Sequence, residues 1–282
     1  MINLLRKVYK KVAGEDAFLA HLPLVLLRAA RGDRTTIRVG TKLLTVDLRD
    51  EVIAFHLVFR KVWEPNETAL VERIVRPGNR VVDIGANIGY YSTIFGGIVG
   101  AGGCVLAIEA DPANAALCEQ NVTQNGLDGT VSVVRAAAGP ASASALLYAS
   151  RNNFGAHTLV KPDREARTIR VDVVPVDELV AAWPRVDFIK VDVEGYEPYV
   201  FEGLRETIAR CPDIKILCEF DPSYILRAGR DPFAFLAELA ALGFAFFDVG
   251  RGGAATETSL SQLRAALEGT RSAKNLLLQR AC

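Results

Sequence analysis

Short apolar runs alternate with segments of helical spacing over most of the chain. The runs are short enough to be buried strands, and they are expected near residues 81–84, 104–108, 131–136, 188–193, 214–220, 244–249 and 274–279. The helical segments are expected near residues 94–99, 112–124, 196–208, 232–243 and 260–268. This alternation predicts an α/β fold of the doubly wound type, with a mostly parallel sheet and helices on both faces.

The first 62 residues precede this alternation and are expected to form an N-terminal extension to a main domain of residues 63–282. The extension is predicted to contain amphipathic helices over Met1–Gly32 and a hairpin that pairs Thr36–Val39 with Leu43–Val46. A helical piece at residues 53–62 follows, and Asn66 is the expected N-cap of a helix over 67–74.

The N-terminus does not have the pattern of an export signal. The acidic pair at residues 15–16 and Pro23 interrupt the apolar stretch, which is also too short to span a bilayer. A peripheral contact with an anionic membrane surface is open to the basic residues of this segment, although a solvated helix face is the commoner role. These basic residues are Arg6, Lys7, Lys10 and Lys11.

Composition changes this picture little. The 33 basic and 33 acidic residues cancel, so the net charge gives no support to a nucleic-acid-binding protein. The five cysteines form no C-x-x-C pair and have no zinc-site spacing with the three histidines. This usage is typical of a reduced, cytoplasmic protein, and no residue is assigned to a metal.

The chemistry is expected to centre on the sequence VVDIGANIGYYS, residues 81–92. Gly85 and Gly89 follow a strand, so the backbone can turn sharply, approach a ligand and enter a helix. Asn87 stands where a dinucleotide fingerprint has its second glycine, which disfavours the pyrophosphate of NAD. S-adenosylmethionine (SAM) has no phosphates and is the cofactor that we expect here.

An acidic residue at the end of the next strand supports the same cofactor. Glu109 can accept both hydroxyl hydrogens of an adenosine ribose, and the small residues from Ala136 to Gly139 leave room for a flat adenine. Glu64 and Glu67 precede the turn and could meet a ligand amine, although acidic residues in a first helical turn need no such role.

A second cluster of charges lies in VDFIKVDVEG, residues 186–195. Asp192 and Glu194 alternate with apolar residues, so they are expected to emerge where a buried strand reaches the ligand edge. The alternative is an internal ion pair between Lys190 and Asp192 that braces the sheet. His157, in a polar loop, is a further candidate base.

Roughly residues 63–219 resemble the FkbM-type SAM-dependent methyltransferases. The motifs that carry the resemblance are WEPNET, VVDIGANIGYYS, AIEADPANAALCEQNVTQNGL and VDFIKVDVEGYEPYVFEGL. The resemblance implies the seven-stranded class I methyltransferase fold with a reversed final strand. It also implies methylation of a hydroxyl group on a sugar, glycolipid or polyketide-like acceptor. Where the family commonly carries proline after the ribose glutamate, this chain has Ala110, which makes the adjoining loop less certain.

The resemblance and the turn together give the candidate residues. Those expected to bind the cofactor are Glu67, Asp83, Gly85, Ala86, Asn87, Gly89, Tyr90, Glu109, Ala110 and Ala137. Those expected to act in catalysis, with Asp192 first as the base that accepts the hydroxyl proton, are Asp192, Glu194 and His157.

Three alternatives stay open at this point. Asp192, Glu194 and Glu219 could hold a Mg²⁺ ion, which is possible but not expected. An NAD-dependent oxidoreductase is disfavoured by Asn87, and a non-catalytic binding module by the intact acidic residues of the two motifs. The acceptor itself does not follow from these residues.

Overall fold

The computed structural model describes residues 17–163, 165–270 and 272–280. Within these ranges, no helix combines the length and the apolar character that a membrane span requires. The basic residues at positions 6, 7, 10 and 11, with their possible membrane contact, lie outside the described residues.

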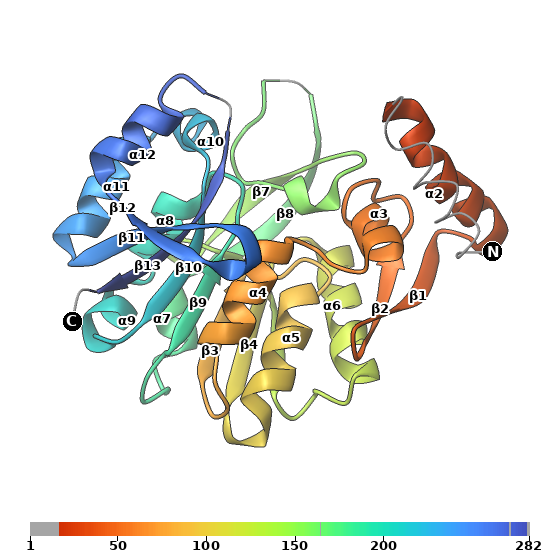
Figure 1. The fold of residues 1–282 in the computed structure, drawn as a ribbon, viewed down its shortest axis with the longest axis horizontal. Coiled ribbons are helices and arrows are strands. Elements are labelled where there is room, and N and C mark those ends of the chain that lie inside the picture. Colours follow the sequence, from red (N-terminus) through yellow and green to blue (C-terminus); the bar gives the residue numbers. More distant parts are fainter. Residues whose placement is uncertain (1–16, 164, 271, 281–282) are drawn as a thin grey trace.

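One central sheet organises the molecule (Figure 1). Its eight strands are, in spatial order, β12 (Ala255–Thr258), β11 (Phe244–Val249), β13 (Lys274–Arg280), β10 (Lys215–Phe220), β9 (Phe188–Val191), β3 (Arg80–Ile84), β4 (Cys104–Glu109) and β5 (Val131–Arg135). Strands β10, β9, β3, β4 and β5 run parallel, whereas β13 is antiparallel to both of its neighbours. The predicted doubly wound fold with a reversed final strand is therefore confirmed.

The eighth strand is the part that the sequence did not predict. β12 pairs with β11 and forms one edge of the sheet. Its sequence, ATET, is mostly polar and its residues are half-buried or exposed. A strand at an edge has little core to face, so it carries no apolar run for a sequence pattern to detect.

Helices cover both faces of the sheet because consecutive strand residues point to opposite sides. Val81 of β3 joins the hydrophobic cluster under α4 (Pro65–Ile74), α5 (Tyr90–Val99) and α6 (Pro112–Gln124). Val82, the next residue, joins the cluster on the other face. The helices of that second face are α7 (Val176–Leu179), α8 (Glu197–Glu202), α9 (Arg205–Arg210), α10 (Pro222–Arg227), α11 (Pro232–Ala241) and α12 (Leu260–Leu267).

Several helix boundaries differ from the expected ones. The helix expected over 196–208 is two helices, α8 and α9, because the backbone of Gly203 packs tightly on Gly139; a Cβ on Gly203 would lie 2.1 Å from the Gly139 carbonyl oxygen. The expected cap Asn66 is wrong: α4 begins at Pro65, and Glu64 is its N-cap. Proline suits the first helical position because the N–H that it lacks would have no partner there.

The described part of the extension contains α2 (Ala17–Arg31) and the hairpin of β1 (Arg34–Val39) and β2 (Lys42–Asp47). It then leads to α3 (Ile53–Phe55) and the π-helical turn η1 (His56–Arg60). The hairpin is as predicted, while the helical piece after it is short and partly π-helical. In Figure 1 the hairpin and α2 lie on the opposite side of the molecule from α11 and α12.

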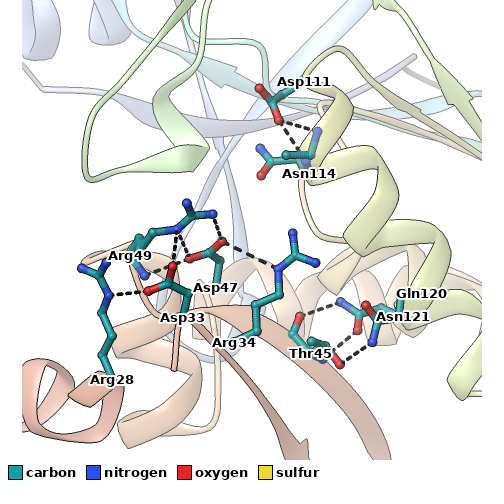
Figure 2. Close-up of polar contacts among 11 residues, drawn as sticks. Arg28, Asp33, Arg34, Thr45, Asp47, Arg49, Asp111, Asn114, Gln120 and Asn121 are labelled. Atoms are coloured by element: carbon teal, nitrogen blue, oxygen red, sulfur yellow. Dashed lines mark hydrogen bonds and ion pairs between the residues drawn. The ribbon is translucent and has the colours of Figure 1, made fainter. Parts of the chain in front are cut away.

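Buried hydrogen bonds join the hairpin to the main domain (Figure 2). The Asn121 side chain accepts from the Thr45 N–H at 2.7 Å and donates to the Thr45 carbonyl at 3.1 Å. The same amide donates to the Ile88 carbonyl, in the glycine turn, at 2.7 Å. The extension and the domain also share one hydrophobic cluster. The division at residue 62 stays a prediction.

A small second sheet lies beside the carboxyl ends of the parallel strands. It has the order β6 (Ala137–Ala138), β8 (Arg167–Val174) and β7 (Ala143–Ala149). The sequence around the polar loop predicts strands at Leu146–Tyr148 and Thr168–Val173, and both are present as the longer β7 and β8. The loop between them includes the short helix η3 (Phe154–Ala156), which reaches the functional edge of the main sheet.

Candidate active site

The turn after β3 leaves no room for a side chain at its first glycine. Gly85 has φ +79°, and a Cβ there would lie 1.8 Å from the carbonyl oxygen of Asp192, in the segment after β9. The N–H groups of Gly85 and Ala86 both donate to the Ile108 carbonyl of β4, at 2.9 and 3.0 Å. The turn is thus held between the ends of two neighbouring strands, and only glycine fits its first position.

Asn87 continues the turn in the left-handed region, with φ +50°. Such a conformation is uncommon outside glycine, and asparagine tolerates it best. Its backbone N–H donates to Glu109 Oε2 at 2.8 Å, and its side chain donates to the Phe154 carbonyl at 3.1 Å. The turn therefore orients the carboxylate at the end of β4 and fastens the loop before His157.

Glu109 is buried, at 7% exposure, and both of its oxygens accept backbone hydrogen bonds. Oε1 accepts from the Asp111 N–H at 2.8 Å, and Oε2 accepts from Asn87. Burial raises the pKa of Glu109 to about 7, although these two backbone donors act in the opposite direction. Each carboxylate oxygen has a second lone pair that can receive a ligand hydroxyl.

Two cavities meet at this turn and share Gly85, Asn87, Gly155 and Asp192 in their walls. The first, which we call the small-residue cavity, is lined by Glu109, His157, Thr158, Tyr196 and small or apolar residues that include Ala110, Ala136, Ala137 and Ala138. The second, which we call the acidic cavity, is lined by residues that include Trp63, Glu64, Ala86, Tyr90, Tyr91, Lys190, Glu194 and Glu219.

An ion pair lies at the border of the two cavities. Lys190 Nζ is 2.5 Å from Asp192 Oδ2, and Lys190 is 3% exposed. Burial by itself lowers the pKa of Lys190, but the carboxylates of Asp192, Glu64 and Asp83 outweigh it, and the net shift is upward. The ion pair was one alternative and a carboxylate at the ligand edge the other. The structure combines them, because Asp192 is paired and also lines both cavities.

Glu64 joins the acidic cavity through an unusual backbone. Its φ of +43° and ψ of +70° are left-handed, a conformation in which a non-glycine residue is strained. The Tyr91 hydroxyl donates to its Oε2 at 2.8 Å. Burial raises the pKa of Glu64 to about 7, with Lys190 acting to lower it.

Glu194 also has a left-handed backbone, with φ +56°. The Thr158 hydroxyl donates to its carbonyl at 2.8 Å, and the N–H groups on either side of it, of Val193 and Gly195, donate to Glu197 Oε1. Burial, followed by the charges of neighbouring carboxylates, raises the pKa of Glu194 to about 8. The turn that carries Glu194 is therefore held from both sides.

Asp83 lies beneath the turn, at 1% exposure, and lines neither cavity. Its Oδ2 accepts from the Ser92 hydroxyl at 2.6 Å, while Oδ1 has no hydrogen-bond partner. Gly89 faces the helix behind the turn, where a Cβ would lie 2.7 Å from Cys118 Sγ. Both residues shape the turn, and their contact with a ligand stays a prediction.

Two candidates lie apart from the acidic cavity. His157 lines the small-residue cavity, where its Nδ1 accepts from the Ser150 N–H at 3.0 Å, and burial lowers its pKa. Glu67 lines neither cavity, and its Oε1 accepts from the Asn275 side chain at 3.1 Å. The acidic residue before α4 that does line one is Glu64.

Two groups near the site were not among the residues predicted from the sequence. The Phe154 carbonyl accepts from both Asn87 and Asn114, each at 3.1 Å, and so draws the polar loop over the turn. Glu197 is buried behind the Glu194 turn. A backbone carbonyl has no sequence signature. The role of Glu197 could have been predicted only if the left-handed backbone of Glu194 had been known.

A comparison with protein families decides how this site is classified. The family model described as the methyltransferase FkbM domain matches residues 83–246, more than half of the chain. The chain belongs to the FkbM methyltransferase family. The predicted resemblance is confirmed, SAM is the cofactor, and the NAD-dependent alternative is set aside.

Matches to individual proteins cover a small part of the chain or have low sequence identity. A protein-L-isoaspartate O-methyltransferase from Aeropyrum pernix is 39% identical over 59 residues, which are 21% of this chain and 23% of that protein. The chain thus matches about a quarter of the length of this curated relative.

Solved structures of low identity resemble the chain over most of its length. A SAM-dependent O-methyltransferase from Thermotoga maritima is 14% identical, with 90% of this chain and 80% of that one covered and a TM-score of 0.43. The O-methyltransferase of tomaymycin synthesis from Streptomyces achromogenes, solved with SAM, is 11% identical, with 77% and 80% covered and a TM-score of 0.45.

The residues of the two cavities fit SAM by their chemistry. A carboxylate with free lone pairs lines the small-residue cavity beside four alanines, which suits a ribose and a flat base. The acidic cavity offers the carboxylates of Glu64 and Asp192, which suit the positively charged amine of the amino-acid end and the sulfonium.

Proposed function

We propose that this FkbM-family protein transfers a methyl group from SAM to a hydroxyl group on a sugar, glycolipid or polyketide-like acceptor. The observation that carries the proposal is the position of Asp192. Its carboxylate follows the end of β9, pairs with Lys190 and lines both cavities at the point where they meet. A base at that junction can serve an acceptor in one cavity and a cofactor that extends from the other.

The cofactor residues are proposed from this arrangement. Glu109 holds the ribose hydroxyls, Ala110 and Ala137 border the adenine, and Ala86, Asn87 and Tyr90 face the amino-acid end. SAM supplies a methyl carbon that is already activated by the sulfonium. The chain has to align the acceptor oxygen, exclude water and remove the hydroxyl proton.

Asp192 is proposed to take that proton. Its Oδ2 accepts a hydrogen bond from Lys190, which fixes the orientation of the carboxylate. Glu194 is the second candidate, and its raised pKa of about 8 would let it hold a proton near neutral pH. His157 is the third, but it lines only the small-residue cavity.

The charge of the acidic cavity supports a neutral acceptor. Glu64, Asp192, Glu194 and Glu219 line it with Lys190 as the cation among them. An acceptor carboxylate, which an isoaspartate methyltransferase would need, would meet repulsion from these groups. A hydroxyl meets no such penalty. The reduced cysteines Cys104, Cys118, Cys211 and Cys218 agree with a cytoplasmic reaction.

The test is an acceptor screen with SAM that carries a labelled methyl group. The panel should include hydroxylated sugars, glycolipids and polyketides, together with an isoaspartyl peptide and a primary amine. The proposal expects label in an ether that survives mild alkali. Label that is found only in an alkali-labile ester or in a methylamine would contradict it.

A further inference from the structure

Three carboxylates from two neighbouring strand ends converge at the floor of the acidic cavity. Asp192 and Glu194 follow β9, and Glu219 is the fifth residue of β10. One oxygen from each of these three residues lies within 4.8 Å of the others. Like charges repel at this distance, so the arrangement costs free energy unless something positive lies between them.

One of these carboxylates has a buried oxygen with nothing to bind. Glu219 Oε2 is inaccessible to solvent and has no hydrogen-bond partner. The charged groups that act on this carboxyl most strongly are other carboxylates, those of Asp192, Glu194, Glu197 and Glu64. A buried acceptor without a donor is uncommon and points to a ligand that the protein chain does not supply.

Lys190 does not fill this role. Its ammonium is already engaged with Asp192 Oδ2 at 2.5 Å, and it also lies 4.8 Å from the centre of the Tyr91 ring. When all three carboxyls are ionised, as mildly alkaline pH favours, one lysine leaves two of the three charges unbalanced. A divalent cation would balance them.

We propose that Asp192, Glu194 and Glu219 bind one divalent cation of the magnesium type. The ligands are carboxylate oxygens, without histidine or cysteine among them, which suits Mg²⁺ or Mn²⁺ better than Zn²⁺. Three protein oxygens leave further positions of an octahedral shell for water or for an acceptor. The backbone of the turn at Glu194 is held by Thr158 and Glu197, so the turn is formed before any ion arrives.

The role of the ion rests on the proposed methyl transfer to a hydroxyl. A cation at this place would coordinate the acceptor through two adjacent hydroxyl oxygens and lower the pKa of the one that reacts. The acceptor class is thereby narrowed to a vicinal diol, or to a hydroxyl beside a carbonyl. Because Lys190 already occupies Asp192 Oδ2, Asp192 would bind the ion through Oδ1 and orient the acceptor through the ion.

The test measures Mn²⁺ binding to the full chain, after metal removal, by electron paramagnetic resonance in mildly alkaline buffer without SAM. We expect one bound Mn²⁺ that excess Mg²⁺ displaces. Glu219→Gln keeps the side chain's shape and should weaken Mn²⁺ binding by about 10–100-fold or more. Glu238→Gln, at an exposed residue of α11, is the control and should bind as the wild type does.

Glu194→Gln is the second variant, in case Glu219→Gln fails to fold, and it should give the same loss. Mn²⁺ binding that is absent from the wild type, or equal in all four proteins, would overturn the inference. SAM binding measured by calorimetry separates it from the proposed function. If SAM binds and methyl transfer continues in a chelator, the ion is not needed, and the hydroxyl proposal stands.

Discussion

The two cavities on either side of the glycine turn are built on opposite principles. In the small-residue cavity, Glu109, the carboxylate that the acidic cavity does not share, has a backbone donor on each oxygen. In the acidic cavity, Glu219 keeps a buried oxygen without a partner, and Lys190 is the cation among several carboxylates. The first cavity is complete without a ligand, while the second depends on positive charge from outside the chain.

This difference teaches where selectivity can reside. A cavity whose polar groups are already satisfied changes little when it is filled, so it can serve the same cofactor throughout a family. A cavity with unbalanced charge gains most from the ligand that balances it. Binding of the acceptor or of a cation is therefore expected to stabilise the acidic cavity more than binding of the cofactor stabilises the small-residue cavity.

The largest effect is expected from a substitution in the glycine turn, where the two cavities meet. Gly85→Ala places a Cβ 1.8 Å from the Asp192 carbonyl oxygen, so the turn and the strand end must separate. SAM binding should be abolished, as measured by calorimetry on protein whose folding is checked by circular dichroism.

Gly229→Ala is the matched control for that change. Gly229 has nearly the same φ, +82° against +79°, but nothing lies within 4 Å of its Cβ position. It carries the backbone strain of about 1–2 kcal/mol without the collision. Equal SAM binding by both variants would mean that the close approach at Gly85 has no bearing on the ligand.

The next effect is confined to turnover. Asp192→Asn keeps the shape of the side chain and removes its charge, so turnover should fall about 10²-fold or more while SAM affinity changes little. Asp187→Asn is the control, because Asp187 precedes β9, pairs with Arg185 and is 22% exposed, against 23% for Asp192. A lower melting temperature with normal turnover per folded molecule would leave Asp192 only a bracing role.

A smaller effect is expected at the satisfied carboxylate. Glu109→Ala should weaken SAM binding by about 1.5–3 kcal/mol, because a charged acceptor of hydroxyl groups is lost. Glu109→Gln keeps one carbonyl oxygen, so its affinity for SAM should lie between those of the wild type and of Glu109→Ala. Glu119→Ala, at an exposed pair with Arg135, serves as the control, and calorimetry that finds no loss in a folded Glu109→Ala protein would refute the ribose assignment.

The smallest expected effect is a dependence of stability on pH. The pKa is raised to about 7 for Glu64, Glu109 and Glu197 and to about 8 for Glu194, mainly by burial. Between the ordinary glutamate pKa and these values, the folded protein holds more protons than the unfolded chain. Its stability therefore falls as the pH rises through this window.

Thermal unfolding without ligand, followed from about pH 5 to pH 8, is the measurement for that dependence. The melting temperature should decrease across this range, and SAM or Mn²⁺ should recover part of the loss at the alkaline end, since each supplies positive charge. A melting temperature that stays constant across this range would show that these carboxyls ionise as freely in the folded protein as in the unfolded one, and one that rises would show that they ionise more readily in the folded protein.

Much of the fold followed from local chemistry. Asp111 and Asp231 each precede a proline and cap a helix through side-chain hydrogen bonds, and both helices begin where the sequence predicted. Such signals work because cap, proline and apolar spacing act within one turn of helix. The short polar edge strand and the broken helix after Glu197 depend on tertiary contacts, so a local pattern could not reveal them.

The site divides in the same way. The glycine turn and Glu109 were visible because strand ends and glycines have fixed spacings. The choice between Glu64 and Glu67 was not, since it depends on a left-handed backbone at Glu64 that places α4 one residue after it. The separation of His157 from the acidic group depends on the path of a polar loop, which its composition does not specify.

The position of the final strand has a consequence for how the chain is made. β13 comes last in the sequence but lies between β10 and β11, paired along both edges. During synthesis, the parallel strands that carry both cavities can assemble first, whereas the pair of β11 and β12 cannot join them until β13 has been made. Until then, the open edge of β10 is a place for wrong pairing, and a chain without β13 would have its sheet unclosed.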